Sequence, residues 1–110
     1  MSAPTTIPVT VEPEAAERIA ELGLQAEFER MLEHARRTIS GLRRIDVVLV
    51  PAYDTGDDPG IVLRAFRDPA CYAEDDPVRD RWREWELATF SPDVHRHFTL
   101  WDVYENDHAR

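Results

Sequence analysis

Two hydrophobic patterns with different periods follow one another near the middle of the chain, and they constrain its fold more than any other feature. Apolar side chains recur at offsets 0, 3, 4, 7 and 11 from Phe28 to Ile39, which is typical of one face of an amphipathic helix. Between Arg44 and Val50 the period changes to two, with Ile45, Val47 and Leu49 on one face. The patterns predict a helix that stops at Gly41 and a strand that follows it.

The flanking sequence supplies the remaining elements. Alternation at Ile7–Val11 predicts a short strand, and Pro13 suits the first turn of the helix that runs on to Ile39. Gly23 either kinks this helix or separates a short helix from a long one. The further elements predicted are a strand at Ile61–Phe66, a helix that begins at Pro77, and a last strand at Phe98–Tyr104.

The resulting order is β-α-β-β-α-β. It predicts an α+β fold of ferredoxin-like type, in which a four-stranded antiparallel sheet carries two helices on one face. A chain of 110 residues fits one domain over residues 1–110, and we expect residues 1–6 and 105–110 to be flexible ends. The predicted core consists of Val9, Val11, Phe28, Leu32, Ile45, Val47, Leu49, Leu63, Trp82, Trp85, Leu100 and Val103.

Negative charge is concentrated in one stretch. Of the net charge of −9, the segment Pro51–Asp76 contributes −5, and the sequence on either side of it is close to balance. Localised acidity repels nucleic acid and anionic lipid, and it attracts basic protein surfaces or metal cations. The charge distribution therefore argues against a nucleic-acid or membrane partner.

The cysteine content and the lack of targeting or membrane-spanning patterns narrow the function further. Cys71 is the single cysteine, so an intramolecular disulfide or a cysteine metal cluster is impossible. The first residues do not have the pattern of a signal peptide, and no apolar run is long enough to span a membrane, so a cytoplasmic location is the default expectation. Pairing of Cys71 with His95 or His97 as nucleophile and base has no supporting spacing, and we assign no catalytic residue and expect no cofactor.

Six residues are candidates for binding a protein partner. Three carboxylates in the predicted loop between the second and third strands supply charge, and exposed aromatic side chains would supply the anchors. The candidates are Asp54, Asp57, Asp58, Trp82, Trp101 and Tyr104. Trp82 and Trp85 repeat at helical spacing, and the preferred interpretation is that they cover the sheet.

A second hypothesis is that the acidic loop between the second and third strands takes part in binding a divalent cation. If the first two strands run one way and the last two run back, the acidic loop and the residues before the last strand meet at one end of the sheet. Carboxylate oxygens and imidazole suit Mg²⁺, Mn²⁺ or Zn²⁺, so Asp54, Asp57, His95 and His97 are candidate ligands.

These observations favour a small acidic, non-catalytic interaction module that binds a basic protein, as an antitoxin, immunity protein or adaptor does. The alternative is a small enzyme or ligand-binding protein with His97 as candidate acid or base, and a homodimer with its sheets packed face to face is one form that it could take. A deep pocket lined by tryptophan and histidine would favour the alternative.

Overall fold

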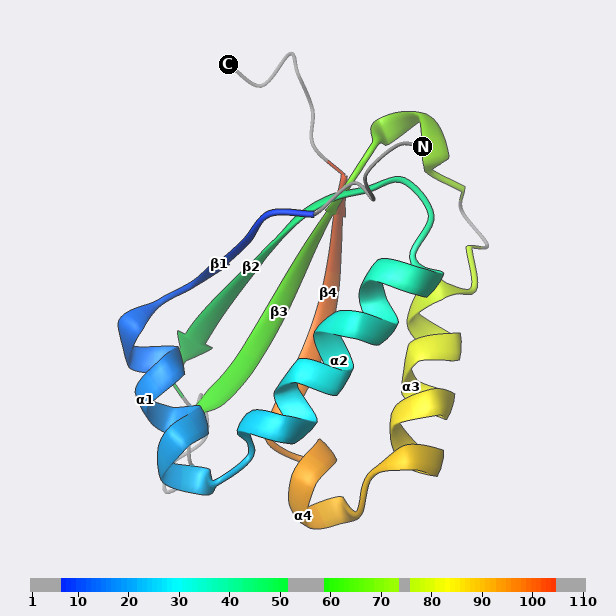
Figure 1. The fold of residues 1–110 in the computed structure, drawn as a ribbon. Helices are drawn as coiled ribbons and strands as arrows, with labels where there is room; N and C mark the ends of the chain where they lie inside the picture. The colour runs from blue at the N-terminus through cyan, green and yellow to red at the C-terminus, as the bar shows by residue number, and fades with distance from the viewer. Residues whose placement is uncertain (1–6, 52–58, 74–75, 105–110) are drawn as a thin grey trace, which may run out of the picture.

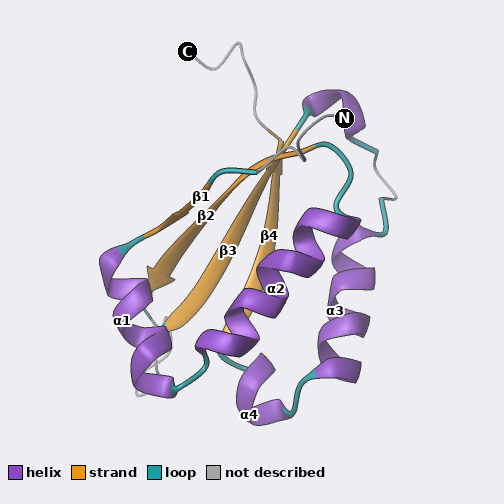
Figure 2. Cartoon of the chain, viewed as in Figure 1, coloured by secondary structure: helices purple, strands orange, loops and turns teal. Residues whose placement is uncertain are grey.

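The strands lie side by side in the order in which they occur in the sequence. The computed structural model describes residues 7–51, 59–73 and 76–104. Its elements are β1 (Val9–Val11), α1 (Pro13–Leu22), α2 (Gln25–Thr38), β2 (Leu42–Val50), β3 (Gly60–Arg67), the 3₁₀ helix η1 (Pro69–Cys71), α3 (Val78–Thr89), α4 (Pro92–His95) and β4 (Phe98–Tyr104). The helices α1 to α4 lie along one face of the sheet (Figures 1 and 2).

The predicted antiparallel ferredoxin-like sheet is wrong. β1 pairs parallel with β2, β2 antiparallel with β3, and β3 parallel with β4, which makes a mixed sheet. The predicted strand directions agree with these pairings, because β1 and β2 point one way and β3 and β4 point back. The error is in the strand order, which is β1-β2-β3-β4. A ferredoxin-like sheet would have β1 between β3 and β4.

The handedness of one crossover is the physical reason for this difference. Connections between parallel strands are almost always right-handed, and two right-handed connections on one face would have to advance in opposite directions along the sheet. Here the β1-to-β2 and β3-to-β4 connections advance in the same direction along the sheet, although the β1–β2 pair and the β3–β4 pair point opposite ways. One connection is therefore right-handed and the other is left-handed. In Figure 1 β1 and β2 descend and advance to the right behind the helices, so the connection through α1 and α2 is left-handed.

Gly23 divides the first helical region into two helices. Its φ of 71° is in the left-handed region, which glycine adopts without the penalty that a Cβ brings. The Gly23 N–H donates to the Ala20 carbonyl and the Leu24 N–H to the Ile19 carbonyl, both at 3.1 Å, so the last carbonyls of α1 are satisfied. The sequence left a kink or a split open, and the structure shows a split.

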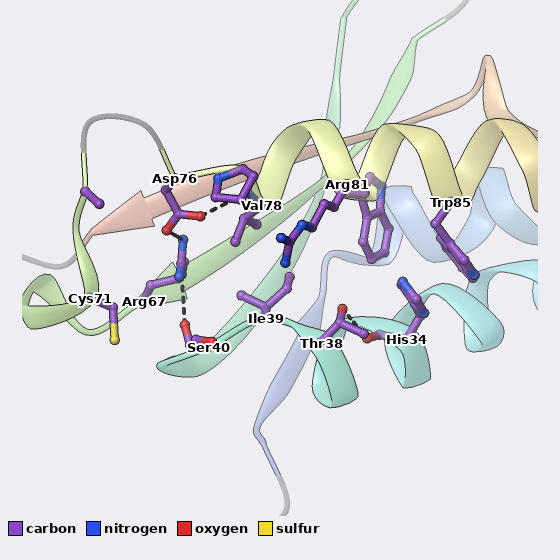
Figure 3. A pocket seen from close by; sticks show the side chains of 13 residues that line it. His34, Thr38, Ile39, Ser40, Arg67, Cys71, Asp76, Val78, Arg81 and Trp85 are labelled. Atoms are coloured by element: carbon purple, nitrogen blue, oxygen red, sulfur yellow. Dashed lines mark hydrogen bonds and ion pairs between the residues drawn. The ribbon is translucent and has the colours of Figure 1, made fainter.

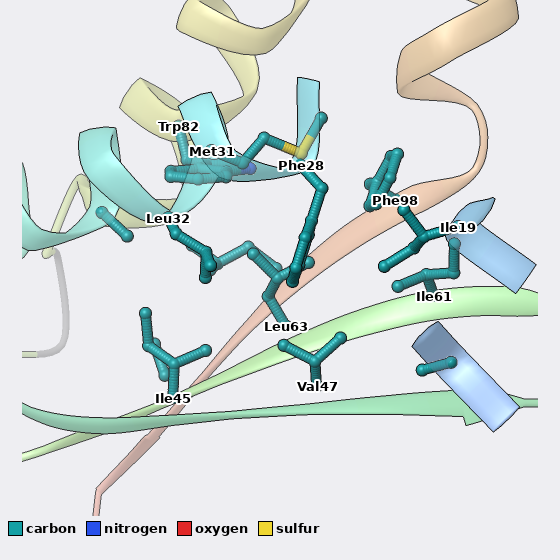
Figure 4. Close-up of a cluster of buried hydrophobic side chains, with 14 of the residues drawn as sticks. Ile19, Phe28, Met31, Leu32, Ile45, Val47, Ile61, Leu63, Trp82 and Phe98 are labelled. Carbon is teal, nitrogen blue, oxygen red and sulfur yellow. The ribbon is translucent and has the colours of Figure 1, made fainter. Parts of the chain in front are cut away.

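The core lies between the sheet and the helices (Figure 4). Seven predicted core residues are buried there: Phe28, Leu32, Ile45, Val47, Leu63, Trp82 and Leu100. Val9, Val11, Leu49 and Trp85 are partly buried against that cluster. The prediction for Val103 is wrong. Val103 pairs with Phe66, and the preceding pair, Ala65 and Asp102, faces the core, so Val103 is on the other face of the sheet. Further core residues are Ala15, Ile19, Met31, Ala35, Ile39, Ile61, Ala65, Phe90 and Phe98.

Candidate functional site

A cavity of about 930 Å³ lies between the C-terminal half of α2, the N-terminal half of α3 and the segment that joins β3 to α3. We call it the α2–α3 cavity. Figure 3 shows its side chains converging from these elements. Its lining residues are His34, Thr38, Ile39, Ser40, Arg67, Cys71, Ala73, Asp76, Pro77, Val78, Arg81, Trp82 and Trp85.

Aromatic side chains form one wall of this cavity. Trp82 and Trp85 are three residues apart on α3 and therefore share a face, with ring centroids 5.2 Å apart. The His34 ring from α2 stacks on Trp85 at 3.8 Å with only 3° between the ring planes. Burial, with a smaller contribution from the charge of Arg37, lowers the pKa of His34, so its imidazole is neutral at pH 7.

A buried arginine forms the opposite, polar end. Arg67 is 1% exposed, and its Nη1 donates to Asp76 Oδ2 at 3.0 Å and to the Tyr104 hydroxyl at 2.7 Å. Its Nε donates to the Ser40 carbonyl at 2.9 Å, and the Asp102 carboxylate lies 3.7 Å from Nη1. The buried positive charge is thus both paired and hydrogen-bonded, as burial requires.

Asp76 connects this arginine to α3. Its Oδ1 accepts the Val78 N–H at 2.9 Å at the start of the helix, while its Oδ2 accepts from Arg67. Burial alone would raise the pKa of Asp76, but the Val78 hydrogen bond, together with the hydrogen bond and charge of Arg67, holds the pKa below its usual value. The carboxylate therefore stays ionised, and it neutralises one of the two arginines that line the cavity.

Arg81 is the second of those arginines. It projects from α3 toward Ile39 and across the cavity, as Figure 3 shows. Unlike Arg67, it makes no hydrogen bond or ion pair with another residue in the described ranges 7–51, 59–73 and 76–104. With His34 neutral and Asp76 ionised, the described lining carries one positive charge that no described carboxylate pairs with, at Arg81.

The three predicted partner-binding residues that the structure describes, Trp82, Trp101 and Tyr104, do not share one surface. Trp82 is 5% exposed and belongs to the core, in agreement with the preferred interpretation that it covers the sheet. Tyr104 is half-buried, with its hydroxyl on Arg67. Trp101 is 41% exposed on the sheet face away from the helices, opposite Arg64. Asp54, Asp57 and Asp58 lie outside the described residues.

The metal hypothesis is also only partly addressed. His97 precedes β4, and its carbonyl accepts the Ile61 N–H at 2.9 Å, which places it at the end of the sheet where β2 stops and β3 starts. This is the end that the sequence predicted for it. Asp54 and Asp57 fall outside residues 7–51, 59–73 and 76–104, and within those ranges no group of three or more metal-ligating side chains is present. The metal site stays a prediction.

Sequence reasoning missed His34, Arg67 and Arg81 as site residues. Arg67 had a usable signal, because it continues the core-facing alternation of Ile61, Leu63 and Ala65, where an arginine is unexpected without a partner. His34 and Arg81 lie on amphipathic helices among many charged residues. No periodicity shows that their two helices meet.

A smaller cavity of about 360 Å³ lies between α3 and β4, lined by Glu86, Arg79, Arg83 and Phe98 among others. Glu86 is only 5% exposed, and its Oε2 has no hydrogen-bond partner in the described part of the chain. Burial raises the pKa of Glu86 to about 7, against a smaller lowering effect of Arg83.

Comparisons with known proteins give no relative from which to transfer a function. No family model, no curated protein and no solved structure matches this chain. In the described ranges no helix is both long enough and apolar enough to cross a membrane.

Proposed function

We propose that this protein binds a small organic molecule in the α2–α3 cavity. The observation that carries the proposal is the cavity itself, whose volume of about 930 Å³ lies within the ordinary range for small-molecule sites. It also has the usual composition of such a site, in which an apolar and aromatic wall faces a few polar groups. A pocket lined by tryptophan and histidine is the feature that favours ligand binding over a purely acidic interaction module.

Binding without chemistry fits the cavity better than catalysis. Cys71 is the only thiol and His34 the only imidazole among the described lining residues, and use of the two as nucleophile and base requires them within hydrogen-bond reach. Figure 3 shows them at opposite ends of the cavity, with Arg67 and Ser40 between them. His97, the acid or base considered from the sequence, is not among the lining residues.

The interaction module is retained as a second candidate because of Trp101. This indole is 41% exposed on the sheet face away from the helices, the face that also carries Phe66, and an exposed tryptophan there suits an interface anchor. The two described carboxylates of the acidic stretch do not add to this surface. Asp68 pairs with Arg43 at 3.5 Å, and Asp76 pairs with Arg67.

A fragment screen by NMR tests the proposal. Small aromatic and aliphatic molecules that are anionic, neutral or cationic are added to the ¹⁵N-labelled protein, and the Trp82 and Trp85 indole N–H signals are followed. We expect fragments to shift these signals and not that of Trp101. The variant Thr38→Trp, which adds a bulky side chain to the cavity lining, should remove the response, whereas Thr99→Trp on the sheet face away from the helices should not. Absence of any such shift, or shifts unaffected by Thr38→Trp, would contradict the proposal.

A further inference from the structure

We propose that the molecule held in the α2–α3 cavity is a planar monoanion, an aromatic or conjugated carboxylate, with Arg81 binding its charge and Trp82 and Trp85 packing against its ring. This inference rests on the proposed function and names the ligand class for the same cavity. It follows from a comparison of the two arginines that line the cavity, because Arg67 is paired with a carboxylate and Arg81 is not paired with a described one.

The first step is that Arg67 does not serve as the anion site. Its Nη1 is shared by the Asp76 carboxylate at 3.0 Å and the Tyr104 hydroxyl at 2.7 Å, and its Nε is used by the Ser40 carbonyl. A ligand anion placed there would have to displace Asp76, which also caps α3 through Val78. Removing one partner of a buried ion pair costs several kcal/mol, so Arg67 is a structural residue.

The second step is that Arg81 remains available. It lines the same cavity without a partner among the residues that the structure describes, and a guanidinium binds a planar carboxylate through two parallel N–H donors. The neutral His34, which also lines the cavity, does not add a second positive charge to it. One uncompensated cation matches a single negative charge. A dianion would leave one charge unbalanced near the Asp76 carboxylate.

The third step concerns the shape of the ligand body. The His34 and Trp85 rings are stacked with 3° between their planes, and Trp82 is inclined to Trp85 by 52°, so flat aromatic surface dominates one wall. A flat ring packs against indole by offset stacking or edge-to-face contact, which a chair-shaped aliphatic ring does less well. A cationic ligand would also be attracted to indole faces, but Arg81 at the same cavity repels it.

Four matched probes test the inference by NMR titration of the intact chain: 1-naphthoate, naphthalene-1-carboxamide, 1-naphthylmethylammonium and cyclohexanecarboxylate. We expect 1-naphthoate to bind about tenfold more tightly than its neutral carboxamide, as one charge-assisted pair predicts. Cyclohexanecarboxylate and the ammonium should bind more weakly than 1-naphthoate. Arg81→Gln should remove the preference for the acid over the amide, whereas Arg83→Gln, two residues further along α3, should preserve it.

The outcomes separate this inference from the function on which it rests. If none of the probes binds in the cavity while other fragments of the NMR screen do, the ligand class is wrong and the binding function stands. If no molecule binds there, the function itself is wrong. If the carboxamide or the ammonium binds as tightly as 1-naphthoate, or if Arg81→Gln keeps the acid preference, the assignment of a monoanion to Arg81 is overturned.

Discussion

The buried carboxyl of Glu86 makes the stability of the protein depend on pH in a direction opposite to that of most carboxylates. Glu86 is 5% exposed between α3 and β4, and burial raises its pKa to about 7 from 4.5. The folded state therefore holds this proton more tightly than the unfolded state does. Its contribution to stability is fully present below pH 4.5 and is lost as the pH rises through 7.

The size of the effect follows from that shift. One pKa unit corresponds to about 1.4 kcal/mol, so the free energy of unfolding loses about 3 kcal/mol between acid and alkaline pH from this group alone. Gln has nearly the same shape as the protonated Glu side chain and cannot ionise. We therefore expect Glu86→Gln to lie within about 1 kcal/mol of the unmodified protein at pH 5 and to be more stable by about 3 kcal/mol at pH 8.5.

Urea unfolding followed by tryptophan fluorescence, at several pH values between 5 and 8.5, measures this difference. Comparing the two proteins at each pH cancels the titration of all other groups. The matched control is Glu84→Gln, an exposed residue on the same helix, which should change stability by at most about 0.5 kcal/mol at either pH. If Glu86→Gln gives no added stability at pH 8.5, the ionised carboxylate has a compensating partner and the reasoning is wrong.

Three further predictions concern the core, a tight turn and the arginine cluster. Val47→Ala should lower the free energy of unfolding by about 2–4 kcal/mol, because Val47 is fully buried, and a loss under 1 kcal/mol in urea unfolding would contradict its place in the core. Gly41→Ala should lower the melting temperature, because Gly41 has a φ of 71° and a Cβ there would come within 2.5 Å of Cys71 Sγ; an unchanged temperature in calorimetry would argue against this approach. Asp76→Asn should lower the free energy of unfolding at pH 7 and flatten its decline toward acid pH. The reason is that the pKa of Asp76 is lowered beside Arg67, so the stability that this carboxylate contributes is lost as the pH falls through its folded-state pKa. If stability falls toward acid pH as steeply as in the unmodified protein, this prediction is refuted.

Local elements could be predicted because each depends on neighbouring residues. The helix at Phe28–Ile39 and the strand at Arg44–Val50 show their periods directly, and α2 and β2 occupy these positions. The strand directions also followed from the alternation of helical crossovers and a hairpin. The strand order did not follow, because it depends on the hand of the β1-to-β2 connection, and no residue in the sequence signals that hand.

The candidate site was harder to predict from the sequence than the fold was. The sequence indicated part of the aromatic wall, because Trp82 and Trp85 have helical spacing. His34, which stacks on Trp85, lies on another helix, 51 positions before Trp85 in the sequence. Of the predicted partner-binding residues, Trp82 and Trp101 lie on opposite sides of the sheet, a relation that depends on strand register.

The sequence by itself determined where the helices and strands form, which faces are apolar, and where the negative charge concentrates, because these properties arise from residues within a few positions of one another. The tertiary structure alone decided the order of the strands, the burial of Arg67 beside Asp76, and the meeting of α2 and α3 around one cavity. Each of these depends on contacts between distant segments, and the free energy of such contacts exists only once the chain has packed.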